Sequence, residues 1–141
     1  MSYSICFAPG LDDDLAQIRS IDINAAALWL ELINAIYDVE AVANELMVDN
    51  GYRFVQPRFD TVPVGVLLRR GYNVSRIKLY KPDGTVQRHR LLYALDYVSS
   101  SCTICLLGLM ERVADYDIQH PYLQRICRDY DDFGVAKIPR G

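Results

Sequence analysis

The sequence has few residues that commonly bind metals: two histidines and four cysteines among 141 residues. Cys102 and Cys105 form a C-x-x-C pair, but residues three apart on a strand point to opposite faces of the sheet. No second ligand pair follows at the spacing of a zinc site. We therefore expect no metal and no cofactor, and we interpret the cysteines as reduced, buried residues.

A long apolar segment is also missing. The longest apolar run, residues 25–30, ends at Glu31 and is far shorter than the ~20 residues that cross a bilayer. The N-terminus has no basic segment and becomes acidic at residues 12–14, which argues against a signal peptide. With 51% hydrophobic and 23% charged residues, the composition is that of one globular domain. We expect a cytoplasmic protein with no membrane partner.

The chain lacks the basic excess that is typical of nucleic-acid-binding proteins, since its formal net charge is −3. Its charge is nevertheless unevenly distributed. Residues 69–90 contain seven Arg or Lys residues and one acid, whereas the rest of the chain contains eight basic and 17 acidic residues. Such a segment can attract an anionic ligand to one face of the protein. An alternative is that basic residues on the strands only discourage aggregation.

Residues 73–112 predict a three-stranded antiparallel meander. Pro82 and Asp83-Gly84 are typical of a tight turn between the first two strands, and the flanking residues are β-branched, aromatic and apolar. Alternation places two groups of side chains on opposite faces of these strands. The expected core face carries Ile77, Leu79, Leu91, Tyr93 and Leu95, and the other face carries Arg76, Lys78, Tyr80, Arg88, Arg90 and Leu92.

The remaining segments predict one strand and several helices around this meander. Residues 1–8 are expected to form a strand, and residues 11–50 a helical layer with acids at its start and Asp38 as the N-cap of a further helix. Residues 51–72 are interpreted as a connection. Residues 52–63 contain two prolines and have little periodicity, so we expect an irregular segment that could include an edge strand, and residues 64–70 could form one or two helical turns. Residues 113–141 predict a C-terminal helix and a tail, with His120 as a turn residue.

This order of elements resembles the RelE/ParE toxin superfamily. Residues 3–18 resemble its opening strand and helix, and residues 75–112 resemble its sheet, with the string R-L-L-Y-A-L-D and the final Glu-Arg as the most similar part. The resemblance implies a single α+β domain with a RelE-like N-terminal strand and helical layer packed on an antiparallel β-meander. The enlarged connection and the extra C-terminal helix are departures from that pattern.

The resemblance also implies a function: a toxin that cleaves mRNA on the ribosome, by attack of a 2′-hydroxyl on the adjacent phosphate at a metal-free basic site. It implies a cognate antitoxin as partner, besides the ribosome and the mRNA. The catalytic residues that it implies are Arg76, Lys78, Arg90, Arg112 and Tyr116. The expected RNA-binding residues are Arg69, Arg70, Lys81, Arg88 and His89. His89 ranks below the arginines because alternation places it on the face opposite Arg90. A ParE-like gyrase inhibitor and a non-catalytic binding or regulatory protein are the alternatives.

Overall fold

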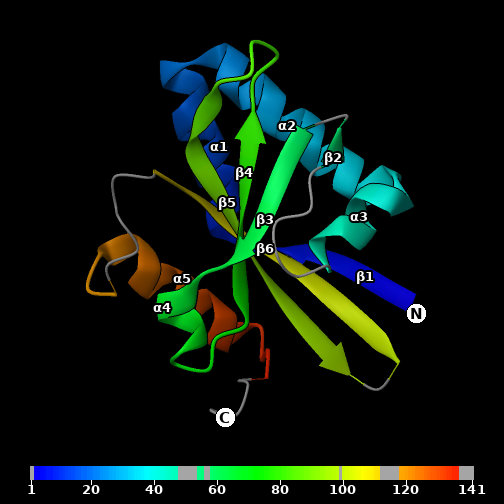
Figure 1. The fold of residues 1–141 in the computed structure, drawn as a ribbon. Helices are drawn as coiled ribbons and strands as arrows, with labels where there is room; N and C mark the ends of the chain where they lie inside the picture. The colour runs from blue at the N-terminus through cyan, green and yellow to red at the C-terminus, as the bar shows by residue number, and fades with distance from the viewer. Residues whose placement is uncertain (1, 48–53, 56–57, 99, 112–117, 137–141) are drawn as a thin grey trace.

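A mixed β-sheet with helices on both of its faces forms the α+β fold (Figure 1). The computed structural model describes residues 2–47, 54–55, 58–98, 100–111 and 118–136. Its strands are β1 (Ser2–Phe7), β2 (Phe54–Val55), β3 (Arg58–Pro63), β4 (Val74–Tyr80), β5 (Val86–Val98) and β6 (Ser101–Glu111). Its helices are α1 (Pro9–Ile21), α2 (Ile23–Asp38), α3 (Glu40–Leu46), α4 (Gly65–Leu68) and α5 (Pro121–Asp132).

The described strands form one six-stranded sheet in the order β1-β6-β5-β4-β3-β2. β1 runs parallel to β6, and every other neighbouring pair is antiparallel. The predicted meander is therefore confirmed as β4, β5 and β6. The predicted turn is confirmed as well: Gly84 donates its N–H to the Lys81 carbonyl at 2.9 Å and has a φ of +89°. Glycine adopts this backbone conformation without the cost that a side chain adds.

The connection over residues 51–72 is more regular than predicted. β3 pairs with β4 over five residue pairs, from Phe59 with Leu79 to Pro63 with Ser75. α4 follows directly after β3. Because β2 pairs with the other side of β3, this strand is not at the edge of the sheet. A strand was expected here only at an edge of the sheet, because prolines interrupt the alternating pattern, although a strand tolerates proline at its end. The helical turn expected within residues 64–70 is present as α4.

Helices α1, α2 and α3 cover one face of the sheet. Their side chains pack with the predicted core face of the meander, and the fully buried Trp29 and Leu32 lie in this cluster. The expected N-cap at Asp38 is wrong, because Asp38 is the last residue of α2 and Val39 precedes α3. The expected end of that helical stretch near residues 50–51 lies outside the described residues.

The meander pattern alone suggested that the opposite face of the sheet is open. In the structure, this face is covered as well. α4 and α5 cover most of it, and Leu67, Leu92, Leu123 and Ile126 are buried there in a second core. Both faces are therefore hydrophobic over most of their area.

Candidate functional site

The basic residues of the meander share a face, as predicted, but they do not form an open cationic surface. Lys78 lies directly opposite Arg90 in the β4–β5 pair. Arg90 is only 4% exposed, and its Nη1 donates to the carbonyl oxygens of Gln87 at 2.6 Å and His89 at 3.2 Å. This guanidinium group stabilises the backbone of β5. It is therefore poorly placed to hold a phosphate.

An acidic residue on β3 lies next to the predicted basic pair. Asp60 pairs with Lys78 in the β3–β4 register, and its Oδ2 accepts a hydrogen bond of 2.7 Å from the Tyr80 hydroxyl. The guanidinium carbon of Arg58 lies 4.3 Å from the centre of the Tyr80 ring. Arg58 and Asp60 were not predicted as site residues, because this segment was expected to be an irregular connection. In the sequence, the charged Arg58 and Asp60 alternate with Phe59 and Thr61, which is a strand signal that could have located them.

The predicted RNA-binding residues are distributed over different parts of the molecule. Arg69 and Arg70 are exposed after α4, and Arg70 borders a groove of about 580 Å³ with Tyr72 and residues of α5. Lys81 is exposed in the turn between β4 and β5. Arg88 and His89 lie on β5, and Arg112 and Tyr116 are outside the residues that the structure describes.

A small cavity lies where α1, the ends of β5 and β6, and the start of α5 meet. Its volume is about 180 Å³. The polar residues that line it come from all of these elements: Asp14, Gln17, His89, Glu111, His120 and Tyr122. Both histidines of the sequence therefore border one cavity. The sequence analysis did not connect them, because 30 residues separate them and His120 resembled a turn residue.

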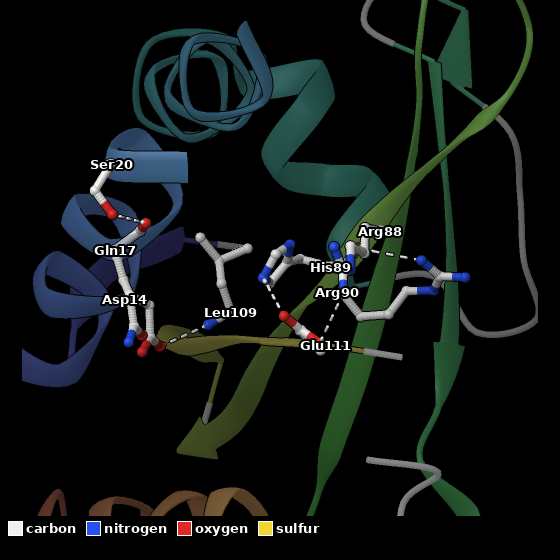
Figure 2. Close-up of polar contacts among 8 residues, drawn as sticks. All are labelled: Asp14, Gln17, Ser20, Arg88, His89, Arg90, Leu109 and Glu111. Carbon is white, nitrogen blue, oxygen red and sulfur yellow. Dashed lines mark hydrogen bonds and ion pairs between the residues drawn. The ribbon is translucent and has the colours of Figure 1, made fainter. Parts of the chain in front are cut away.

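Glu111 connects the two neighbouring β5 residues Arg88 and His89 (Figure 2). Its Oε1 lies 3.9 Å from His89 Nε2, and its Oε2 lies 3.7 Å from Arg88 Nη2. The Arg88 side chain is 70% exposed, whereas the His89 side chain is 17% exposed. Burial lowers the pKa of His89, and the nearby Glu111 opposes this effect only in part. His89 is therefore a neutral imidazole at pH 7, the form that can accept a proton.

His120 is the N-cap of α5. Its Nδ1 accepts a hydrogen bond of 3.1 Å from the Tyr122 N–H, and the two rings are stacked with their centres 5.7 Å apart. Because Nδ1 accepts this hydrogen bond, the neutral ring carries its proton on Nε2. His120 can therefore serve as a hydrogen-bond donor at the edge of the cavity.

Asp14 forms the wall of the cavity behind Leu109. The last main-chain bond between β1 and β6 runs from the Ala8 N–H to the Leu106 carbonyl. Beyond this bond β1 has ended, and the Leu109 N–H of β6 donates to the Asp14 carboxylate at 2.9 Å (Figure 2). The Asp14 side chain thus provides the acceptor that a neighbouring strand would provide. Asp14 was expected to be one of the acids that stabilise a helix N-terminus, and this interpretation is wrong. Asp14 is spaced from Leu11 and Ile18 so that all three lie on one side of α1. This spacing was the sequence signal that Asp14 faces the sheet.

Arg125 of α5 completes this contact. Its Nη1 and Nη2 donate to the two Asp14 carboxylate oxygens at 3.0 and 2.7 Å. The pKa of Arg125 is raised, mainly by these hydrogen bonds. Gly108 leaves the space for them, because a Cβ atom there would lie 2.1 Å from Arg125 Nη2. Asp14 is thus occupied in joining α1, β6 and α5 and is not a free base in the cavity.

Comparisons with known proteins give no match, whether with protein-family models, curated proteins or solved structures. Within the described ranges, no group of three or more His, Cys, Asp or Glu residues is placed to hold a metal ion. The helices of the described part of the chain are too short or too polar to cross a membrane. The functional interpretation therefore depends on the residues around the cavity.

Proposed function

We propose that this protein is a toxin of the RelE/ParE type that cleaves mRNA on the ribosome without a metal ion, and that the cavity beside His89 is its catalytic site. The observation that carries the proposal is the His89–Glu111–Arg88 arrangement. A partly buried neutral imidazole, a carboxylate and an exposed guanidinium group lie together there. The RelE/ParE assignment itself depends on the sequence resemblance. A cognate antitoxin and a cytoplasmic location follow from that assignment.

In the proposed reaction, His89 takes the proton from the 2′-hydroxyl, whose oxygen attacks the adjacent phosphorus. The bond from phosphorus to the 5′-oxygen then breaks, giving a 2′,3′-cyclic phosphate and a 5′-hydroxyl that takes a proton from solvent. Glu111 stabilises the imidazolium that forms on His89. Arg88 and the Nε2–H of His120 stabilise the charge on the phosphate, since donors aimed at developing charge lower the barrier.

The size of the cavity is consistent with this division of roles. At about 180 Å³ it is smaller than the ~300 Å³ at which pockets for whole small ligands begin. It can therefore receive a phosphate and part of a ribose, while the bases lie outside. Arg88 is exposed and lies 3.7 Å from Glu111, which lines the cavity, so it can attract the backbone of an RNA strand.

The basic strand residues that were predicted to be catalytic have other roles in this proposal. Arg90 acts as a positioning residue, because its Nη1 donates to the carbonyl of His89 itself. Arg76 and Lys78 add positive potential from the neighbouring strand. Arg112 directly follows Glu111 in the chain and Tyr116 comes four positions later, and their roles stay predictions.

A non-catalytic binding protein on the same scaffold is the second candidate. It is favoured by the position of Asp60 next to Lys78 and by the internal hydrogen bonds of Arg90. Both reduce the number of cations available to a phosphate. A ParE-like gyrase inhibitor needs no nuclease site either, and the absence of RNA cleavage by the unmodified protein would favour these alternatives.

The decisive experiment compares variants in a translation extract, with primer extension across the translated mRNA. His89→Gln should lower the cleavage rate about 10²- to 10⁴-fold, the usual contribution of a positioned base. Glu111→Gln should lower it less, and Arg19→Ala, which removes an exposed cation from α1, should not change it. Full activity of His89→Gln would refute the catalytic site. Ribosome binding without any cleavage would refute the nuclease and leave the binding protein.

A further inference from the structure

Two cysteines that are distant in the sequence are in contact in the structure. The Sγ atoms of Cys6 and Cys105 lie 3.0 Å apart, although 99 positions separate the residues. Cys6 lies opposite Cys105 in the parallel pair β1–β6, so both side chains are on the face covered by α5. Both are free thiols. The pair differs from the C-x-x-C of Cys102 and Cys105, whose side chains lie in separate cores on opposite faces.

We propose that Cys6 and Cys105 are a reversible oxidation site, which a peroxide converts into a disulfide between β1 and β6. This inference is independent of the proposed nuclease function. Neighbouring strands lie about 4.8 Å apart, within the range of Cα separations that disulfides span. The sulfur atoms need to approach by only about 1 Å to reach the S–S bond length of about 2.05 Å.

The two thiols have different roles because their surroundings differ. Cys6 is partly exposed on an edge strand, whereas Cys105 is 2% exposed. Burial raises the pKa of the Cys105 thiol, and the neighbouring Cys6 adds to this effect. A peroxide therefore meets Cys6 first, since thiolate character and access determine which cysteine is oxidised.

The chemistry balances without a further reagent. The Cys6 thiol releases its proton, and the thiolate attacks hydrogen peroxide. The O–O bond breaks, Cys6 becomes a sulfenic acid, and the departing hydroxide takes up the released proton as one water molecule. The Cys105 sulfur then attacks the Cys6 sulfur, the S–O bond breaks, and the departing hydroxide takes the Cys105 proton as a second water. Two thiols are oxidised and one peroxide is reduced. A low-molecular-weight thiol reverses the change by thiol–disulfide exchange.

The disulfide would fix an edge strand whose only strand partner among the described residues is β6. β1 leads directly into α1, which carries Asp14 to the wall of the cavity. A link between residues 6 and 105 also closes a long loop in the unfolded chain. The oxidised protein should therefore resist unfolding and exchange the β1 amides more slowly.

The test treats the reduced full-length protein with hydrogen peroxide under native conditions and maps its peptides by mass spectrometry without reduction. We expect one linked pair, Cys6 with Cys105, that dithiothreitol releases. We also expect thermal unfolding to shift upward by roughly 10 °C, as chain-entropy estimates for such a loop suggest. Cys102→Ser is the matched control, because Cys102 is also buried in β6 but faces the other core. It should form the same link, and Cys6→Ser should form none.

Three results would overturn the proposal: no linked peptide in the wild-type protein, a link that uses Cys102 or Cys127, or a sulfinic acid on Cys6 in place of the disulfide. The peptide map of the wild-type protein needs no variant. It therefore stays decisive even if a cysteine substitution prevents folding.

Discussion

Asp14→Asn should be among the most destabilising single substitutions where α1 meets the sheet. Asp14 is 4% exposed and accepts three hydrogen bonds, from the Leu109 N–H and from both terminal nitrogens of Arg125. The amide keeps the volume of the carboxylate but removes its charge. Breaking a buried ion pair by changing one partner costs about 3–5 kcal/mol. Arg125 is 22% exposed, so water compensates in part, and we expect a loss of about 2–4 kcal/mol.

Gly108→Ala tests the same contact from the other side. The added Cβ would lie 2.1 Å from Arg125 Nη2, so the guanidinium group has to leave Asp14. The two substitutions therefore remove one interaction. In the double variant, the losses of unfolding free energy should be clearly less than additive, as is usual for residues that share a contact.

Urea unfolding of the four proteins measures these values. A domain of this length is stable by roughly 7–20 kcal/mol, and urea slopes of about 1–3 kcal/mol per molar make a shift of roughly 0.7–4 M expected for Asp14→Asn. Asp13→Asn is the matched control, because Asp13 is the neighbouring acid on α1 but is exposed. It should change stability by less than about 0.5 kcal/mol. A loss below about 1 kcal/mol for Asp14→Asn, or additive losses in the double variant, would refute this reasoning.

Three further predictions use other parts of the structure. Arg90→Ala should lower the urea midpoint because it removes the donor to the Gln87 carbonyl in a buried hydrogen bond and to the His89 carbonyl in a partly buried one. Arg88→Ala should leave stability nearly unchanged and weaken RNA binding most at low salt. Folding lowers the pKa of His89 below 6.5, so the unfolded chain binds the imidazole proton more tightly than the folded protein does. The free energy of unfolding should therefore fall as the pH drops below 6.5. Urea titrations at several pH values should show a smaller fall for His89→Gln. Gly84→Ala should cost about 1 kcal/mol in the same assay, since φ is +89° and no atom lies within 4 Å of the added Cβ.

The meander was predictable because its signals are local. Alternation set the faces of β4 and β5, and the residues from Lys81 to Gly84 set the turn. The prediction of one exposed basic face failed for a non-local reason. Apolar residues on that face, such as Leu92, pack under α4 and α5, and the pattern of one strand does not show what covers it.

The candidate site depends on contacts that the sequence cannot show by spacing. Asp14 reaches Leu109 across 95 positions. The register between β5 and β6 shifts between Leu92 and Tyr93, so Gly108 faces Leu92 and can admit Arg125. A bulge changes the side on which later residues of a strand lie, and alternation alone misassigns them. His89 and Arg90 lie on opposite faces of β5, as alternation predicted. The contact of His89 with Glu111 depends on this register and could not be predicted from alternation.

A ligand can reach the sheet at the place where β1 ends. The strand stops at Phe7, whereas β6 continues to Glu111, so the last residues of β6 extend beyond their parallel neighbour. Because helices cover both faces, this uncovered edge is where polar side chains from α1, β5, β6 and α5 can meet. Asp14 satisfies the exposed backbone there, which leaves His89 and Glu111 available for a substrate. A substrate that bound over the central β4–β5 face would first have to displace α4 and α5, and the proposed site requires no such rearrangement.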